Sequence, residues 1–292
     1  MKPAAFRYVR ARSVEHAVQA LSEADAGGKI IAGGQSLMPM MNFRLVKPSV
    51  VVDINRIPGL DSVERRGDRV LIGALVRHRM TASDPLIAQH APVLREAMKH
   101  VAHLTVRNRG TFCGSICHAD PAAECPMIAR LLNAVIHIAS PRGERRMPSR
   151  DFFTGSLMTA LEQDELVTGV EIDILPAGTG WGFEEFARRH GDYALAAAAV
   201  TMRWADGQAL DVRISLTGVA DTPVRMPEAE AALEGSMMSS AKLDEAVEAL
   251  RAAITPNSDN SASSDFRRHL AGALARRALN SAWTRAAEGR AR

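Results

Sequence analysis

The chain has 292 residues, of which 47% are hydrophobic and 24% charged, and it carries a formal net charge of +3 at pH 7. This length allows two domains, and the composition is typical of a globular protein with a substantial core. The basic residues are scattered or lie beside acidic ones and form no stripe interleaved with aromatics, so we expect no binding to nucleic acid.

The cellular compartment is predicted from the amino terminus and the cysteines. No apolar stretch precedes a cleavage site, and no segment reaches the roughly eighteen apolar residues of a membrane span. All 3 cysteines lie within residues 113–125. An odd number at close spacing argues against a disulfide framework and fits a reducing compartment. We therefore expect a cytoplasmic protein without a membrane span.

The first 55 residues have the pattern of a small α/β unit. Ser13 is a predicted N-cap, followed by apolar residues at helical spacing as far as Leu21. Apolar and β-branched runs at residues 29–32 and 49–54 predict two strands. Further strands are predicted at residues 69–75, 134–139 and 166–174.

Helices are predicted between the later strands. Asp84 and Pro85 open a helical region that Pro92 restarts and that extends to about His103. Another helix is predicted to begin at Pro121, with its N-terminus pointing back toward the preceding loop.

The last third of the chain has a different pattern. The break in composition at residues 176–180 predicts a domain boundary at 178, and we interpret residues 178–182 as a linker because the glycines there do not match a dinucleotide fingerprint. Three strands are predicted at 183–188, 193–204 and 210–218, the last two joined by an Asp-Gly hairpin turn. Helices are predicted at 227–233, 241–254 and 266–286. This order indicates an antiparallel sheet covered on one face by helices.

A loop with two adjacent glycines follows the predicted strand at 29–32. It consists of Ala32, Gly33, Gly34, Gln35, Ser36 and Leu37. Glycines let the backbone adopt positive φ and let N–H groups approach an anion, to which Gln35 and Ser36 add side-chain hydrogen bonds. The alternative is an ordinary turn between a strand and a loop.

A second glycine loop, residues 109–115, lies about eighty residues later and runs into the segment 116–126. Two such loops can clamp one pyrophosphate from different sides. The sequence contains no phosphate-binding P-loop motif, so a nucleotide bound through its phosphates has to be held by these two loops.

Four segments in order carry a resemblance to a known family. They are AGGQSLMPMMNFRL, IGALVRH, RNRGTFCGSICHADPAAECP and FARRHGDYALAAAAV. Together they resemble the FAD-binding medium subunit of the molybdenum hydroxylases, which include aerobic carbon monoxide dehydrogenase, xanthine dehydrogenase-type and heteroaromatic dehydrogenase complexes. The resemblance implies an α+β fold with an FAD-binding domain of the vanillyl-alcohol-oxidase/PCMH type at 1–177, in subdomains of about 1–55 and 56–177. A C-terminal domain with a three-stranded antiparallel sheet and helices is expected at 178–292.

The resemblance also implies which residues bind FAD. In the first loop these are Ala32, Gly33, Gly34, Gln35, Ser36 and Leu37, and in the second loop Thr111, Gly114 and Ser115. Glu124 aligns with a position that reaches the adenosine ribose. Asp120 is either a ligand contact or a helix N-cap, and Tyr193 either stacks on the flavin or packs in the core.

The second loop departs from the family pattern, because Cys113 stands where the family usually has a glycine. Either its backbone has an ordinary negative φ and its thiol points away, or the phosphate contact is looser. Replacing Cys113 by glycine is expected to do no harm. The cysteines and nearby histidines match no standard zinc or iron–sulfur motif, so we expect no metal on this chain.

The resemblance thus implies an FAD-containing electron-transfer subunit, with no catalytic residue of its own for the substrate. The [2Fe–2S] centres and the molybdenum cofactor are expected on a small iron–sulfur subunit and a large molybdenum subunit, in a dimer of heterotrimers. The ADPAAE segment favours a heteroaromatic substrate over carbon monoxide. The alternatives are a carbon monoxide dehydrogenase medium subunit, a stand-alone FAD-dependent oxidoreductase and a flavin-free scaffold.

Overall fold

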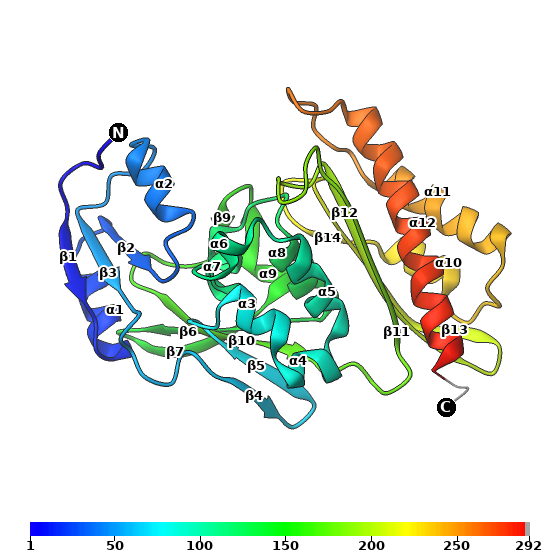
Figure 1. Cartoon of the computed structure of the whole chain (residues 1–292), viewed down its shortest axis with the longest axis horizontal. Coiled ribbons are helices and arrows are strands. Elements are labelled where there is room, and N and C mark those ends of the chain that lie inside the picture. Colours follow the sequence, from blue (N-terminus) through cyan, green and yellow to red (C-terminus); the bar gives the residue numbers. More distant parts are fainter. Residues whose placement is uncertain (290–292) are drawn as a thin grey trace.

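The computed structural model describes residues 1–289, and three larger sheets follow one another along the long axis of the molecule (Figure 1). The first is parallel, with β1 (Arg7–Arg10), β3 (Val50–Asp53) and β2 (Gly28–Ile31) in that order. Helix α1 (Val14–Ser22) packs against it, and the Ser13 hydroxyl accepts the His16 N–H at 3.1 Å, which confirms the predicted N-cap.

The second sheet is antiparallel, with five strands in the order β4, β5, β10, β6 and β7. These strands are β4 (Val63–Arg66), β5 (Arg69–Gly73), β10 (Leu166–Asp173), β6 (Val135–Ser140) and β7 (Gly143–Pro148). The three central strands were predicted, whereas the edge strands β4 and β7 were not. Both edge strands are mainly charged and exposed, so their sequences carry no alternation of apolar residues.

Short helices lie above this sheet (Figure 1). They are α3 (His78–Ser83), α4 (Pro85–His90), α5 (Pro92–His100), α6 (Leu104–Arg107), α7 (Phe112–His118), α8 (Glu124–Leu131) and α9 (Ser149–Phe152). A small hairpin, β8 (Phe153–Gly155) with β9 (Met158–Thr159), follows α9. Helix α2 (Leu37–Asn42) belongs to the first unit.

The start of helix α8 differs from the prediction. The helix begins at Glu124, not at Pro121, and its N-cap is Ala123. The Asp120 carboxylate accepts the Ala122 N–H at 2.9 Å, which folds residues 120–123 into a turn before the helix. Asp120 is therefore not the N-cap of this helix.

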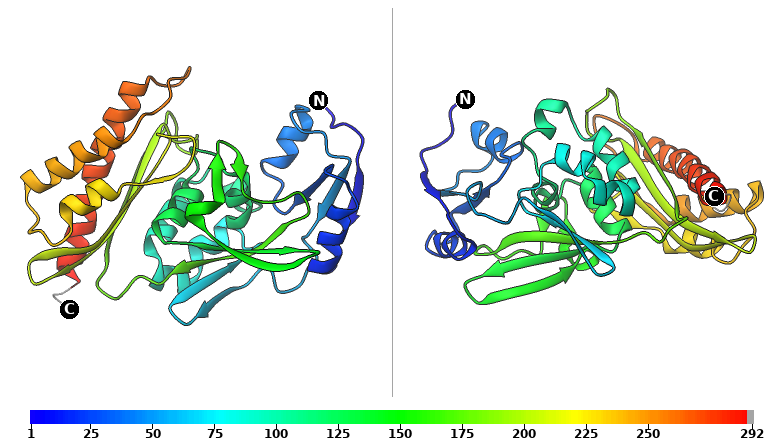
Figure 2. Two further views of the ribbon diagram at one scale, coloured as in Figure 1. Left: turned by 180° about the vertical axis from the view of Figure 1, so that it is seen from behind. Right: turned by 60° about the horizontal axis from the view of Figure 1, so that its bottom comes forward.

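The third sheet consists of β11 (Gly180–Phe186), β12 (Ala196–Ala205), β13 (Gln208–Thr217) and β14 (Val224–Arg225), all antiparallel. The predicted hairpin is confirmed, because Asp206 and Gly207 both have positive φ between β12 and β13. The two-residue strand β14 was missed. Helices α10 (Pro227–Leu233), α11 (Ser240–Ala253) and α12 (Ser264–Glu288) cover the outer face (Figure 2).

The four-stranded sheet is buried on both faces, which corrects the prediction of one covered face. Ala196 and Ala198 of β12 belong to the core formed with α10–α12, whereas Ala197 and Ala199 belong to the core of the preceding part of the chain. Helices α5 and α8 supply the inner cover. A run of small apolar residues without alternation is typical of a strand covered on both sides.

The glycines at 178–182 are not all linker residues. Gly180 and Gly182 lie in β11, where a Cβ would sit 1.8 Å from the Ala282 carbonyl oxygen and 2.0 Å from that of Ala278. They allow α12 to pack directly on the sheet. Only Gly178, with a φ of +77°, belongs to a turn. The domain division at 178 stays a prediction.

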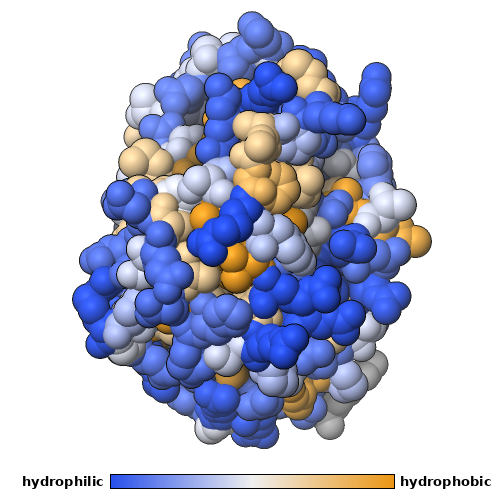
Figure 3. Space-filling view, turned by 90° about the vertical axis from the view of Figure 1, so that its left-hand side faces the viewer, coloured by the Kyte–Doolittle hydropathy of each residue, from blue (hydrophilic) through white to orange (hydrophobic). Residues whose placement is uncertain are grey.

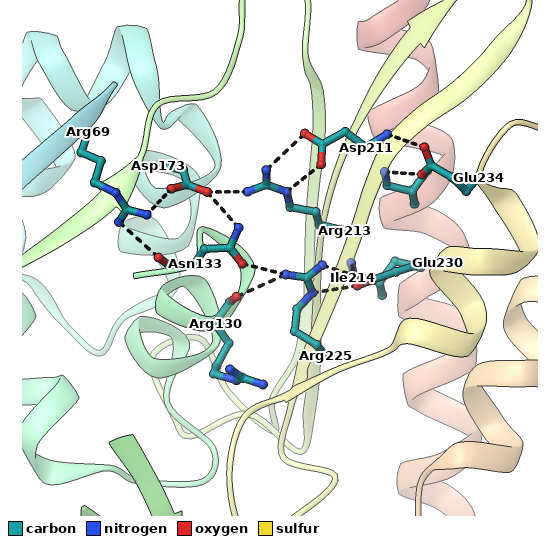
Figure 4. A network of polar contacts seen from close by, with 11 residues as sticks. Arg69, Arg130, Asn133, Asp173, Asp211, Arg213, Ile214, Arg225, Glu230 and Glu234 are labelled. Atoms are coloured by element: carbon teal, nitrogen blue, oxygen red, sulfur yellow. Dashed lines mark hydrogen bonds and ion pairs between the residues drawn. The ribbon is translucent and has the colours of Figure 1, made fainter. Parts of the chain in front are cut away.

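A network of ion pairs joins the third sheet to the second (Figure 4). Arg213 on β13 contacts Asp173 of β10 at 2.9 Å, and Asp173 also contacts Arg69 at 2.8 Å and Asn133 at 2.9 Å. Arg225 on β14 contacts Glu230 at 2.7 Å and Asn133 at 3.3 Å. These partly buried contacts fix the orientation of the C-terminal sheet.

The face that carries the first sheet is mainly hydrophilic, and its apolar residues form small groups between the hydrophilic ones (Figure 3). Within residues 1–289, no helix combines the length and the apolar character needed to cross a lipid bilayer.

Candidate functional site

The first glycine loop connects β2 to α2 and leaves several backbone donors unused. Gly34 has a φ of +70°, a conformation that favours glycine. Within residues 1–289, the N–H groups of residues 33–36 donate no hydrogen bond to a protein acceptor. The Gln35 side chain donates to the Gly33 carbonyl at 3.0 Å. Ser36 is the N-cap of α2 but makes no capping bond with its side chain, and Leu37 is the first helical residue. The loop therefore presents donors to an anion.

The second loop lies directly against the first. A Cβ on Gly33 would sit 2.3 Å from the Arg109 carbonyl oxygen and 2.8 Å from the Gly110 Cα. Gly110 in turn packs on His78, whose N–H donates to the Gly110 carbonyl at 2.9 Å. Glycines at 33 and 110 are thus required for the two loops to meet.

The side chains of Asn55 and Arg77 connect these two loops. Asn55 donates to the Ala32 carbonyl at 2.8 Å and to Asp53 at 2.7 Å. Arg77 donates both to the Arg109 carbonyl and to the Asn55 side-chain oxygen. Neither Asn55 nor Arg77 was predicted from the sequence to belong to the site. Arg77 lies in the segment IGALVRH, but its partner is 22 residues away, and no local pattern reveals such a contact.

Two open hollows flank this junction. One, with a volume of about 470 Å³, is lined by the first loop, Tyr8, Asn55 and Arg109. The other, of about 380 Å³, is lined by four arginines and shares Asp53, Asn55 and Arg109 with the first. These arginines are Arg10, Arg56, Arg77 and Arg109. Their charge makes the surroundings of the two loops favourable for a phosphate group.

Asp53 is the acidic member of this junction. Desolvation acts to raise the pKa of Asp53, but hydrogen bonds from Tyr8 and Asn55 outweigh it and hold the pKa below the ordinary value. The carboxylate therefore stays charged and orients Asn55 toward Ala32.

The second loop is shaped by the start of α7. The Thr111 hydroxyl accepts the Gly114 N–H at 3.0 Å, so Thr111 is the N-cap of this helix. Gly114 is exposed and Ser115 half-buried, so both are accessible from outside. Cys113 is buried in the helix with its thiol 3.5 Å from the Ile72 carbonyl. The thiol therefore points away from the loop surface, which confirms the first of the two alternatives.

Asp120, Glu124 and Tyr193 form a second group, where the inner face of the third sheet meets α8. Desolvation and the charges of Asp120 and Glu124 raise the pKa of Tyr193 to about 12. Yet 61% of the surface of Tyr193 is exposed, so it is not a core residue and its ring is accessible. Glu124 is only 7% exposed, and burial raises its pKa to about 7. Its contact with a ribose stays a prediction.

Glu185 and His100 extend this second group, and neither was predicted from the sequence to belong to it. The Glu185 side chain on β11 is 4% exposed, and its Oε2 has no hydrogen-bond partner among the described residues. Its Oε1 lies 4.0 Å from His100 Nδ1. Burial and the charge of Glu124 raise the pKa of Glu185 to about 8, whereas burial lowers that of His100. Both shifts favour the neutral forms, so this contact is not an ion pair at neutral pH.

The described residues contain no group of three or more His, Cys, Asp or Glu side chains placed to hold a metal ion. What they contain is a double loop of backbone donors surrounded by arginines, with an accessible tyrosine beside buried carboxyl groups. This arrangement suits a ligand that has phosphates in its middle and a planar ring at one end.

Comparison with known proteins identifies the family. Residues 4–173 match the family model described as FAD binding domain in molybdopterin dehydrogenase, and residues 181–282 match the CO dehydrogenase flavoprotein C-terminal domain. The chain therefore belongs to the family of FAD-binding medium subunits of molybdenum hydroxylases. It is a flavoprotein subunit of the oxidoreductase class.

Three relatives illustrate the similarity. The nicotine 6-hydroxylase medium subunit of Paenarthrobacter nicotinovorans is 42% identical over 98% of this chain and 100% of its own length. A chain of carbon monoxide dehydrogenase from Hydrogenophaga pseudoflava matches with a TM-score of 0.95 and 38% identity, over 98% of this chain and 99% of that one. A chain of quinoline 2-oxidoreductase from Pseudomonas putida 86 gives 0.93 and 38%, over 98% and 100%.

Proposed function

We propose that the protein is the electron-transfer subunit of a heteromeric molybdenum hydroxylase. In this role it passes electrons from iron–sulfur centres on a partner subunit to an external acceptor. When bound, FAD supplies the redox chemistry, because a flavin accepts electrons singly or in pairs. The chain supplies the binding site and the orientation of the flavin.

The observation that carries this proposal is the junction of the two glycine loops. Four consecutive N–H groups at residues 33–36 lack a protein acceptor within residues 1–289, and Gly33, Gly34 and Gln35 line the first hollow, where an anion can accept from them. The pyrophosphate of FAD is the partner that fits them. Gly114 and Ser115 approach it from α7, while Thr111 shapes that end of the helix.

Tyr193 is proposed to stack on the flavin ring. Its accessible ring belongs to the C-terminal part of the chain, whereas both glycine loops belong to the FAD-binding domain. FAD would therefore run from the loops toward the third sheet. In the sequence, Asp120 lies between the second glycine loop and Tyr193, and in space it lies near Tyr193. There it would border the flavin-ring end of FAD.

The arrangement of the complex is also a proposal. We place the [2Fe–2S] centres on a small iron–sulfur subunit and the molybdenum cofactor on a large subunit, assembled as a dimer of heterotrimers.

We further propose that the FAD-binding domain is of the vanillyl-alcohol-oxidase/PCMH type. The 3 cysteines are free thiols, which supports a cytoplasmic location.

A heteroaromatic compound is the proposed substrate of the complex. The relative named for nicotine is 42% identical to this chain, and the chain of carbon monoxide dehydrogenase is 38% identical to it. The relative named for quinoline is also 38% identical to this chain. Nicotine and quinoline both contain a nitrogen heterocycle. The preference therefore rests on similarity to subunits that serve such substrates.

The binding part of the proposal is tested with the purified chain and FAD alone. We expect one FAD per chain, held without a covalent bond, so denaturation should release all of the flavin into the filtrate. Protein that stays colourless after incubation with excess FAD would contradict the proposal. Flavin that remains attached after denaturation would contradict the noncovalent mode only.

A further inference from the structure

Arg267, in the first turn of α12, is a buried cation that binds two main-chain carbonyl groups. It is 8% exposed, and its Nη1 donates to the Leu195 carbonyl at 2.6 Å and to the Gly218 carbonyl at 3.1 Å. Its Nη2 donates to the Asp259 carboxylate at 2.8 Å. Because a buried guanidinium is costly unless it is paired, these three contacts hold it in one position.

The first carbonyl belongs to the segment that carries Tyr193. Leu195 lies two residues after Tyr193 and directly before β12, and its N–H donates to the Phe186 carbonyl at 2.8 Å. Tyr193 itself is 61% exposed, so packing of its own side chain contributes little to fixing the ring, although its hydroxyl has a side-chain hydrogen bond with Asp120. The position of the ring therefore depends on the backbone at Leu195 and on the segment that carries Asp120.

The second carbonyl belongs to a residue that holds the segment with Asp120. The Gly218 N–H donates to the Pro121 carbonyl at 2.8 Å, and the Thr217 hydroxyl donates to the same oxygen at 2.7 Å. Gly218 has a φ of +77°, and a Cβ there would lie 2.7 Å from the Leu195 oxygen. The three segments around Arg267 thus meet with no space for a larger residue at 218.

We propose that Arg267 is a positioning residue for Tyr193. By binding the Leu195 and Gly218 carbonyls together, it fixes the tyrosine ring relative to the segment 120–123 and thereby sets how the ring stacks on the flavin. This inference rests on the proposed function in one respect, the contact of Tyr193 with bound flavin. Arg267 acts through the backbone at Leu195, two residues from Tyr193.

The test compares flavin binding with flavin fluorescence in Arg267→Met. This variant keeps the apolar stem of the side chain and removes its donors. The glycine loops lie in the FAD-binding domain, so FAD should still bind at one per chain. A tyrosine stacked on the flavin quenches its fluorescence, so the bound flavin should become about twofold or more brighter in the variant.

Two further variants identify the cause of this change. Tyr193→Leu should brighten the bound flavin to a similar extent, and the double variant should be no brighter than Tyr193→Leu alone, because both changes remove one interaction. Arg268→Met is the matched control. Arg268 is the next residue of the helix, and within residues 1–289 its one ion pair is with Asp265 at 2.8 Å, so its loss should leave the fluorescence as in the wild type.

Asp259→Asn keeps the test decisive if Arg267→Met does not fold. The Asp259 side chain is 56% exposed and orients the guanidinium, so this milder change should give a smaller increase in brightness. Unchanged fluorescence in Arg267→Met or Asp259→Asn, with Tyr193→Leu brightened, would overturn the role of Arg267. FAD that binds with no effect of Tyr193→Leu would overturn the inference as well. Absence of FAD binding in the wild type would instead contradict the proposed function.

Discussion

The Asn55 side-chain amide donates a 2.8 Å hydrogen bond to the carbonyl oxygen of Ala32, the residue at which the first glycine loop begins. The oxygen of the same amide accepts a hydrogen bond from Arg77, which also binds the second loop at Arg109. The Asn55 side chain thus sets the position of the two loops relative to each other. Since both loops are proposed to hold one pyrophosphate, their spacing decides how well it fits.

Replacing Asn55 by alanine should therefore weaken FAD binding. The change removes the bond to Ala32 and leaves Arg77 with one acceptor fewer, a loss of about 1–3 kcal/mol. We expect the Kd for FAD, measured by titrating the apoprotein and following flavin fluorescence, to rise about tenfold. Asn257→Ala is the control, because Asn257 bonds Asp221 at 3.1 Å in the C-terminal part. Equal Kd values for both variants would rule out the role of Asn55.

Valine at Gly33 or Gly34 should abolish FAD binding for two different reasons. At Gly33 a Cβ would collide with the second loop, and at Gly34 the φ of +70° opposes any branched side chain. Gly67→Ala is the control for backbone strain without a collision. Gly67 has a φ of +63°, and no atom lies within 4 Å of where its Cβ would be. It should lower the melting temperature but leave FAD binding intact. A Gly33→Val protein that retains flavin would show that the loops need not touch.

Replacing Cys113 by glycine should reduce stability without changing affinity for FAD. From the sequence alone this change was expected to do no harm, but the thiol is buried against Ile72 and the residue lies within α7. Loss of the side chain and a glycine in a helix together cost about 1–3 kcal/mol of unfolding free energy. Cys113→Ala should recover about 1 kcal/mol of this. The comparison is made by chemical denaturation, and a changed Kd for FAD would contradict the account of the thiol.

Local signals made part of the fold predictable. The Ser13 cap, the Asp206-Gly207 turn and the glycine pair at 33–34 each depend on residues within a few positions of one another. Pro121 was misleading, because the turn made by Asp120 delays the helix to Glu124. The glycines at 180 and 182 were interpreted as linker because their partner, α12, lies about a hundred residues later.

The candidate site was predictable only in its loops. Asn55, Arg77, Glu185 and Arg267 act through partners that are distant in the chain, and single polar residues of this kind carry no periodic pattern. Glu185 in particular directly follows another glutamate, and it lies on the same face of its strand as Phe183, the inner face, which was expected to be exposed. The burial that raises its pKa arises only when α5 and α8 cover that face.

The carboxyl group of Glu185 should make stability depend on pH. Its pKa is about 8 in the folded chain, against an ordinary value of 4.5 when unfolded. Below pH 4.5 both states are protonated. As the pH rises toward 8, the unfolded chain loses this proton first, so the free energy of unfolding falls by up to about 1.4 kcal/mol per pH unit.

Glu185→Gln keeps the shape of the side chain and cannot ionise. Its free energy of unfolding, measured by urea denaturation between pH 5 and pH 8, should therefore decline less steeply than that of the wild type. Glu184→Gln is the matched control, because Glu184 precedes Glu185 on the same strand and pairs with Arg277 at 3.1 Å. If Glu185→Gln and the wild type share one slope, Glu185 does not hold a proton in the folded chain.

The most direct test of the central claim is to measure substrate turnover, iron, molybdenum and FAD in two preparations of this chain. One is the complex that copurifies with it from its native cell, and the other is the isolated chain reconstituted with FAD. We expect the complex to contain all three and to reduce an artificial acceptor with a heteroaromatic substrate of the nicotine, purine or quinoline type. The isolated chain should contain FAD alone and show no turnover. Turnover by the isolated chain, free of iron and molybdenum, would contradict the electron-transfer role.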